Sequence, residues 1–284
     1  MKHGFFSIRM MTSFSKKAWM CAGCALAATV VFGGTPQEDA FMRVWRAHAQ
    51  DPTRHDAIIE ICQSVMDKSA TLGEYLPVVK TIAAWHLLAN GKQQDAVRVF
   101  ESVLTTDPAA PVLARSANTM ARRWLTRIDH IAVEKALRAY YAANVAFPES
   151  LRSLMTQPNP PPKTDRFGAE WVYKTESLSK VANTKNQRFT LHSQTLGSRL
   201  TALKNFTFTS YGKRQASIIA RRQGPPMMVD FETLTEPGAA PLRGTTSEGS
   251  AVNGIRFLKL SSDGQFAMMI ENDNDFWVVA TGGR

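Results

Sequence analysis

Apolar residues recur every three or four positions between residues 38 and about 143, which is the spacing of α-helices that bury one face. One apolar stripe spans residues 57–65, a second spans 76–87 and a third spans 96–104. From residue 206 onward the pattern changes to alternation of apolar and polar positions, which is typical of β-strands. The chain is therefore predicted to be helical first and β-rich last.

Two pairs of residues mark where the predicted helices end. Asn90-Gly91 follows the second stripe, and such a pair readily takes the left-handed conformation that closes a helix. Asp107-Pro108 follows the third stripe, and proline cannot continue the helical hydrogen-bond ladder. We therefore expect the second helix to stop at the first pair and the third helix to stop at the second pair.

Small and aromatic residues within 77–110 have the spacing of a tetratricopeptide repeat. They are Ala84, Leu87, Gly91, Ala96, Phe100 and Pro108. The segment resembles that family, in which small residues let two antiparallel helices approach and the aromatic ring fills the gap between them. The resemblance implies protein binding through a concave helical surface, with neighbouring helices covering the single unit. A plain helical bundle that happens to match is the alternative.

A second motif lies in residues 131–173. Its members are Ala136-Leu137, Tyr140, Asn144, Phe147-Pro148, Leu151, Leu154, Asp165-Arg166-Phe167-Gly168, Trp171 and Tyr173. The segment resembles the globular part of the type II secretion major pseudopilin and its pilin-like relatives, and residues 188–193 resemble the strand that closes such a domain. The resemblance implies an α-then-β module over residues 128–195. Its core is expected to include Tyr140, Phe147, Trp171 and Tyr173.

The chain departs from the pseudopilin pattern at several points. Val145 stands where the family has Gly after the Asn, and Arg166 stands where it has Pro. The family joins its module directly to an apolar N-terminal helix with a glutamate, whereas here other helices intervene and no acid lies in residues 18–34. No counterpart of the family's calcium-binding loop is found. The resemblance therefore implies the fold module without filament assembly or calcium binding.

The C-terminal part is predicted to form about six strands, separated by Gly-, Pro- and Asn-containing turns. The strands are residues 206–211, 216–220, 227–231, 255–260, 266–270 and 276–280. Residues 237–253 are rich in Gly, Ser, Thr, Pro and Ala, so they predict a mobile loop.

The order of these strands resembles the small β domain of the connector proteins of type II secretion and type IV pili. Those proteins link the inner-membrane platform to the outer-membrane secretin. The residues that carry the resemblance are Tyr211-Gly212, Ala216, Ile218, Gly254-Ile255, Leu260, Asp263-Gly264 and Trp277-Val278. An unrelated small sheet is the alternative.

A targeting segment precedes these regions. Lys16-Lys17 is followed by an apolar run from Ala18 to Phe32 and then by small residues, as in a secretory signal. Such a run spans roughly 25 Å as a helix, which is marginal for a hydrocarbon core of ~30 Å. A cleaved signal is favoured, and membrane anchoring through residues 18–34 or lipid anchoring at Cys24 are the alternatives. The positive-inside rule places residues 35–284 outside the cytoplasm in each case, so the protein is expected to be exported and periplasmic.

Composition and charge narrow the candidate partners. The 284 residues are 44% hydrophobic and 20% charged, which indicates an ordered protein of two or three small domains. Residues 174–222 contain ten Lys or Arg and one acid, Glu176, within a chain of formal charge +10. The predicted export of the protein from the cytoplasm argues against nucleic acid as the partner. The basic stretch is then either a solvated face or a site for an anionic protein, lipid headgroup or cell-wall polymer.

Searches for catalytic or metal-binding patterns find none in the sequence. There is no His-Glu-x-x-His, Gly-x-Ser-x-Gly or phosphate loop, and the six histidines are scattered along the chain. His86 is interpreted as a wall residue of the helical repeat. Cys62 is the single cysteine outside the targeting segment, so it cannot form an internal disulfide and is expected to be buried. No enzyme activity, cofactor, metal or small-molecule substrate is therefore predicted.

The sequence predicts an α+β multidomain protein. Its parts are a signal peptide or membrane anchor at 1–34, a tetratricopeptide-like helical region at 35–127, a pseudopilin-like α+β module at 128–200 and a small antiparallel β domain at 201–284. The functional hypothesis is an exported, non-catalytic adaptor of a type II secretion or type IV pilus-like machine, which binds envelope or secretion-system proteins. An envelope enzyme accessory or unrecognised hydrolase is the alternative. The predicted partner-binding residues are Trp85, Lys213, Arg214, Arg221 and Arg222.

Overall fold

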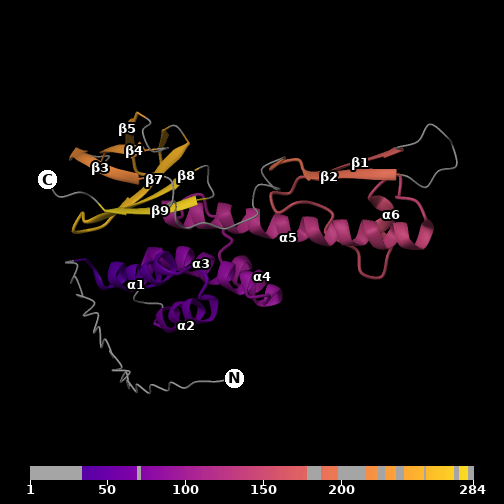
Figure 1. Cartoon of the computed structure of the whole chain (residues 1–284), viewed down its shortest axis with the longest axis horizontal. Coiled ribbons are helices and arrows are strands. Elements are labelled where there is room, and N and C mark those ends of the chain that lie inside the picture. The colour runs from indigo at the N-terminus through magenta and orange to yellow at the C-terminus, as the bar shows by residue number, and fades with distance from the viewer. Residues whose placement is uncertain are drawn as a thin grey trace, which may run out of the picture. The chain divides into compact units, whose positions relative to one another are not determined.

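Figure 1 shows the computed structural model of the chain. The structure describes residues 34–68, 72–177, 187–197, 215–222, 228–234, 240–252, 254–271 and 275–280. These residues form α-helices and antiparallel sheets, so the predicted α+β class is confirmed. The predicted targeting segment (except Gly34) and the predicted strand 206–211 lie outside the described residues.

The helical first third begins with four helices. They are α1 (Pro36–Gln50), α2 (His55–Met66), α3 (Leu76–Ala89) and α4 (Gln93–Glu101), and the 3-10 turn η2 (Gly73–Tyr75) leads into α3. A capping box starts α1, because Thr35 Oγ1 accepts from the Glu38 N–H and the Glu38 carboxylate accepts from the Thr35 N–H. Gly91 follows α3 with φ +76°, which confirms the predicted left-handed helix end.

A single long helix, α5 (Val112–Asn144), contributes to two separate hydrophobic clusters. Its 33 residues correspond to about 50 Å at ~1.5 Å per residue. The first half of α5 packs with α1–α4, and its second half, through Val133 and Leu137, packs with residues of α6 (Arg152–Met155) and the following strands. The predicted boundary between residues 127 and 128 lies inside this helix.

The third predicted helix is shorter than the sequence pattern suggested. It was expected to run to Asp107-Pro108, but α4 ends at Glu101. After α4 the N–H groups of Val103 and Leu104 donate to the carbonyls three residues back, and the Thr105 N–H donates to the side chain of Asn118 on α5, at 3.1 Å. The α-helical hydrogen-bond ladder therefore ends before the proline.

The second half of α5 is covered by a two-stranded antiparallel sheet. Strand β1 (Trp171–Ser177) pairs with β2 (Gln187–Ser193) along their full lengths. The four aromatic residues expected to share a core do so: Trp171 is buried, and Tyr140, Phe147 and Tyr173 pack against the same cluster. The Trp171 ring is also held by the loop before β1, because its Nε1 donates a hydrogen bond to the Pro162 carbonyl at 3.0 Å.

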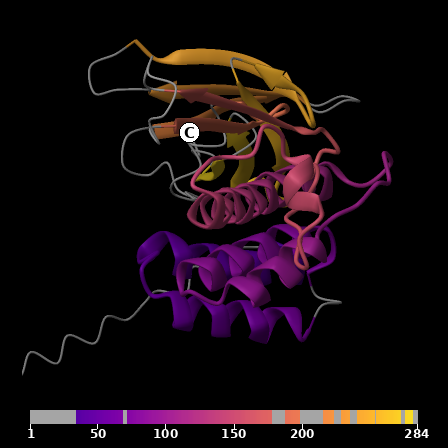
Figure 2. The same ribbon diagram turned by 90° about the vertical axis from the view of Figure 1, so that its right-hand side faces the viewer.

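The remaining strands form two more antiparallel sheets. One is β3 (Gln215–Arg222), β4 (Met228–Leu234) and β5 (Leu242–Ser247), in that order. The other is β6 (Ala251–Val252), β7 (Ile255–Leu260), β8 (Phe266–Glu271) and β9 (Asp275–Ala280). Figure 2 shows α1–α4 on one side of α5 and these two sheets on the other.

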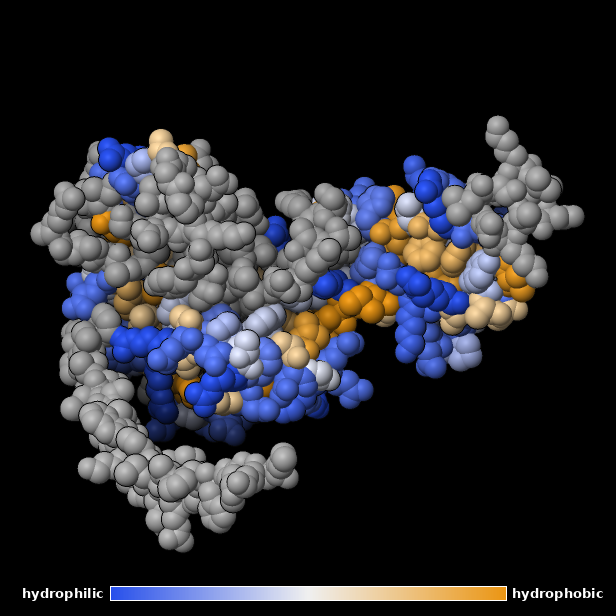
Figure 3. Space-filling view, in the orientation of Figure 1, coloured by the Kyte–Doolittle hydropathy of each residue, from blue (hydrophilic) through white to orange (hydrophobic). Residues whose placement is uncertain are grey.

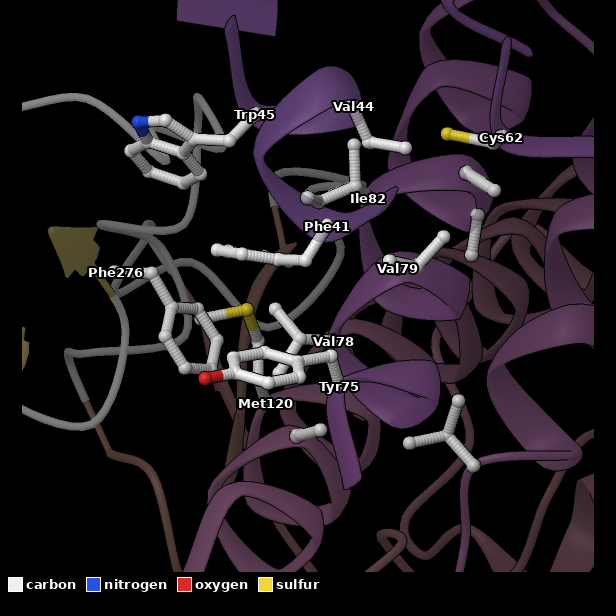
Figure 4. Close-up of a cluster of buried hydrophobic side chains, with 14 of the residues drawn as sticks. Phe41, Val44, Trp45, Cys62, Tyr75, Val78, Val79, Ile82, Met120 and Phe276 are labelled. Atoms are coloured by element: carbon white, nitrogen blue, oxygen red, sulfur yellow. The ribbon is translucent and has the colours of Figure 1, made fainter. Parts of the chain in front are cut away.

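The β6–β9 sheet is buried on both faces. Alternate residues of β7 and β8 point in opposite directions, so Phe257 and Met269 pack against the β3–β5 sheet while Leu258 and Met268 join the helical cluster. In Figure 4, Phe276 of β9 lies among Phe41, Tyr75 and Met120 of the helices. The sheet and the helices therefore share one core.

The predicted mobile loop at residues 237–253 is wrong, because it contains β5 and β6. Thr245 and Thr246 are β-branched and fit an extended strand. Position 244 of β5 requires glycine because the Phe231 ring approaches it closely. A Cβ there would lie 2.8 Å from Phe231 Cζ. The small residue at position 244 therefore reflects close packing between strands β4 and β5.

Val145 provides a stability prediction at the end of α5. It has φ +57°, a left-handed conformation that costs a β-branched residue about 1–2 kcal/mol, and 47% of its side chain is exposed. Val145→Gly should therefore raise the free energy of unfolding by about 1 kcal/mol, measured by chemical denaturation. Gly91→Ala is the matched control, because Gly91 is also left-handed with no atom within 4 Å of an added Cβ, and it should lower that free energy. A Val145→Gly protein no more stable than the parent would contradict the left-handed helix end.

Candidate functional site

Trp85, the predicted partner-binding residue of the helical region, lies half-buried on α3 beside three histidines. Its ring centroid is 4.6 Å from that of His86, 5.6 Å from that of His55 and 5.7 Å from that of His48. His48 belongs to α1, and His55 is the first residue of α2. We call these four residues the tryptophan–histidine cluster. These three histidines are scattered along the sequence, and folding brings them together.

The three imidazoles form a chain with His86 at its centre. His86 Nε2 lies 2.8 Å from His48 Nδ1, and His86 Nδ1 lies 2.9 Å from His55 Nδ1. A neutral imidazole carries one N–H donor and one acceptor nitrogen, so His86 donates to one neighbour and accepts from the other. The tautomer of His86 sets the direction of both hydrogen bonds.

Burial keeps the imidazoles of His48 and His86 uncharged. His48 is 1% exposed and His86 is fully buried, whereas His55 is half-buried. Desolvation, with the neighbouring imidazole charge of His55, lowers the pKa of His48 to about 4. Desolvation, with His48 and His55 beside it, lowers the pKa of His86 to about 3. Both inner rings are therefore neutral at pH 7.

The cluster does not have the geometry of a metal site. The two nitrogens of His86 point to different neighbours, so the three rings do not present one nitrogen each to a common point. Across the described ranges, no group of three or more His, Cys, Asp or Glu side chains is arranged to hold a metal ion.

Helical spacing could have revealed part of this cluster. His48 follows Phe41 and Trp45 on the buried face of α1, and His86 follows Ile82 by four residues on α3. Both histidines therefore occupy positions that point into the core. The contact between them required knowledge of how α1 packs on α3, which no local pattern provides.

The other predicted partner-binding residues lie elsewhere in the chain. Lys213 and Arg214 are outside the described residues. Arg221 and Arg222 belong to β3, where they pair with Val229 and Met228 of β4. The structure describes no contact that joins these residues to Trp85.

Acidic residues that a search for catalysis would consider are used in folding. Asp165 accepts from the N–H groups of Phe167 and Ala169 and, at 2.6 Å, from the Ser193 hydroxyl. Burial opposes ionisation of Asp165, but the bonds from Ser193 and the two N–H groups hold its pKa below its usual value. This carboxylate closes the turn before β1.

No protein-family model, curated protein or solved structure matches this chain. Within the described part of the chain, none of the helices has both the length and the apolar character needed to cross a bilayer.

The tryptophan–histidine cluster makes stability depend on pH. In the unfolded chain His48 and His86 titrate near 6.5, so between pH 6.5 and about 4 the unfolded state binds more protons than the folded state. The free energy of unfolding should therefore fall as the pH is lowered through this window, by on the order of 3 kcal/mol from His48 alone. Denaturant titrations at several pH values measure this fall.

His48→Phe should flatten the dependence, because it removes one of the two buried titrating groups while keeping a ring in the core. His192→Gln is the control, since His192 is exposed on β2 and outside the cluster. Equal slopes in the parent and the His48→Phe protein would show that the cluster does not carry the effect.

Proposed function

We propose that the protein is an exported, non-catalytic scaffold or adaptor that binds other proteins of a type II secretion or type IV pilus-like envelope machine. The observation that carries the proposal is α5, a continuous helix that contributes to two separate hydrophobic clusters. A shared rigid helix is a suitable way to display two binding modules from one chain. The proposal includes export by the N-terminal segment, with anchoring through residues 18–34 as one possible mode of attachment.

The helical cluster supports the tetratricopeptide-like part of the proposal. Ala84, Ala96 and Phe100 are fully buried in one core, where α3 packs against α4. Small residues at these positions allow the close approach of two antiparallel helices. Neighbouring helices α1, α2 and α5 cover the pair, as a single repeat unit requires.

The second cluster supports the pseudopilin-like part. A long helix covered by an antiparallel hairpin matches the α-then-β arrangement that the resemblance implies. Val145 is left-handed at the position where the family has Gly, and Gly is the residue that tolerates this conformation best. The fold around the motif is therefore compatible with its sequence.

Exposed apolar surface on α5 favours a partner protein. Ile131, near the middle of the helix, is 53% exposed, and Figure 3 shows apolar residues on the visible side of α5. Contiguous exposed apolar patches mark sites of protein–protein contact. The alternative, an enzyme accessory or hydrolase, would use the 270 Å³ hollow beside Trp171, which two acids, Glu149 and Glu170, and two bases, Arg152 and Lys163, line.

The basic residues provide the test of this proposal. Replacing Lys213, Arg214, Arg221 and Arg222 by Glu should slow association with an acidic envelope partner and weaken the dependence of that rate on salt. Recovery of secretion-system proteins from envelope extract, identified by mass spectrometry, should fall with this variant.

A matched variant controls for the change in total charge. It reverses four exposed cations outside α5, Arg43, Arg46, Lys92 and Arg98, and should recover partners like the parent. Equal recovery by the parent and the first variant would reduce the basic stretch to a solvated face. A turnover on an envelope polymer that one Asp, Glu or His substitution abolishes would move the protein to the enzyme class.

A further inference from the structure

Glu38, in the first turn of α1, has a buried carboxylate that is held by donors from distant parts of the chain. Its residue is 3% exposed. Glu38 Oε1 accepts hydrogen bonds from the Ser262 N–H at 2.7 Å and from the Tyr75 hydroxyl at 3.4 Å. Glu38 Oε2 accepts from the Ser262 hydroxyl at 2.6 Å and from the Thr35 N–H at 2.8 Å. The carboxylate therefore joins the start of α1 to the turn between β7 and β8.

These hydrogen bonds favour the ionised carboxylate but bring no positive charge to it. Burial opposes ionisation of Glu38, yet the hydrogen bonds from Ser262 and Thr35 hold its pKa below the usual value. In the part of the chain that the structure describes, no ion pair includes Glu38, and Lys259 of β7 pairs with Glu74 at 2.6 Å. Buried charges in proteins are usually paired, because an isolated charge loses its hydration. A cation beside Glu38 would therefore complete the site.

Gly34 lies directly against this carboxylate. A Cβ added to Gly34 would be 2.9 Å from Glu38 Oε2, which is closer than ordinary van der Waals contact. The oxygen is held in that place by Ser262 and Thr35. The Gly34 nitrogen is two bonds from such a Cβ, so it lies within about 5.4 Å of Oε2. Opposite charges at ~4–6 Å stabilise each other's ionised forms, so a positive charge on this nitrogen would suit Glu38.

The Gly34 nitrogen carries a charge only when the chain begins at this residue. Val31-Phe32-Gly33 resembles the A-x-A-like sequence at which secretory signals are cleaved. Hydrolysis of the Gly33–Gly34 bond by a signal peptidase consumes one water and leaves a carboxylate on Gly33 and an ammonium group on Gly34. Ala25-Leu26-Ala27 is a second candidate, but cleavage there would leave the ammonium group six residues before Gly34. Only the first cleavage places the new charge beside Glu38.

We propose that a signal peptidase cleaves the chain between Gly33 and Gly34, and that the new α-ammonium group of Gly34 pairs with Glu38. The α1 dipole opposes a cation at this end of the helix with about half an elementary charge. Glu38 and Asp39, both in the first turn, supply two negative charges against it. The inference rests on the export included in the proposed function, and it adds the processing site and the role of the new terminus. The folded core is more stable after cleavage than before it.

Mass spectrometry of the N-terminal peptide locates the cleavage in protein exported by cells that express the full chain. We expect a peptide that begins at Gly34 with a free amine. An exported protein that begins at Ala28, or at any residue other than Gly34, would overturn the inference while leaving export intact. A chain that keeps residues 1–33 would contradict export as well, so the two failures are distinguishable.

Denaturant titrations of the protein that begins at Gly34, with this amine free or acetylated, measure the pair. Acetylation should raise the unfolding equilibrium constant about fivefold at pH 6.5, the upper end for a pair that water reaches. An α-amino group titrates near pH 8 in an unfolded chain, and pairing favours its charged form in the folded state. The stabilisation is therefore present below about pH 8 and should be lost at pH 10.5.

The other ionisable groups near the carboxylate are the same in both proteins, so their titration cancels from the comparison. They are Glu74, Tyr75, Lys259 and Asp263. A difference between the free and acetylated proteins that persists unchanged at pH 10.5 would show a steric effect of the acetyl group and would overturn the pair.

Two variants in the first turn of α1 identify the partner of the amine. Glu38→Gln keeps an acceptor at a position where capping boxes use Glu or Gln, but removes the charge, so acetylation should then change the unfolding equilibrium constant less than twofold. Asp39→Asn is the matched control, because Asp39 is an exposed acid of the same turn, and it should keep the fivefold effect. Equal effects of acetylation in the two variants would overturn the assignment to Glu38. If Glu38→Gln does not fold, the parent compared at the two pH values still decides whether the charge of the amine matters.

Discussion

A helix as long as α5 needs its apolar face covered, since helices in proteins draw most of their stability from packing. Residues from Leu113 to Leu125 are covered by the helices that precede α5 and by the β6–β9 sheet. Residues Val133 and Leu137 are covered by a different set of residues, including Leu154 and Trp171. The demand for burial along one helix thus determines how the rest of the chain is arranged around it.

An ion pair between buried Asp129 and partly exposed Arg166 lies between these two covered stretches. Asp129 is 6% exposed, and Arg166 binds both of its oxygens, with Nε at 2.5 Å and Nη2 at 3.2 Å. Arg166 also reaches Glu101 of α4 through Nη1, and its backbone N–H donates to Thr126. Without Arg166, the buried charge of Asp129 would lose its compensation. Because the Arg166 side chain is 30% exposed, water screens the pair in part.

Arg166 stands where the pseudopilin pattern has Pro, and its contacts explain what arginine contributes at this position. Proline at this position could neither donate its backbone N–H to Thr126 nor pair with Asp129. The hydrogen bond that Arg166 donates to Asp129 favours the charged guanidinium and so raises the pKa of Arg166. Arginine therefore fastens the turn that precedes β1 to the middle of α5.

Local patterns predicted the elements whose ends depend on nearby residues. The strand 255–260 has the predicted bounds, and the helix over 76–87 ends at the expected Asn90-Gly91 pair. The pattern failed where distant contacts decide the outcome. The Thr105 N–H, which follows α4, donates to Asn118 of α5, and the Phe231 ring packs on Gly244 of an unpredicted strand.

For the candidate site, too, local sequence predicts which residues share a helix but not which helices bring their residues together. Helical periodicity placed Trp85 and His86 on one helix but not beside His48 and His55, which come from α1 and α2. Such constellations depend on packing that no short window of sequence contains.

Hydrogen exchange of the backbone amides along α5, read by mass spectrometry, tests the central claim that one continuous helix is common to both cores. The account predicts slow exchange from about residue 116 to residue 144, with residues 126–132 protected as well as the stretches on either side. A rapidly exchanging segment at residues 126–132 between two protected ones would contradict it, because two helices joined by a hinge would then replace the shared one.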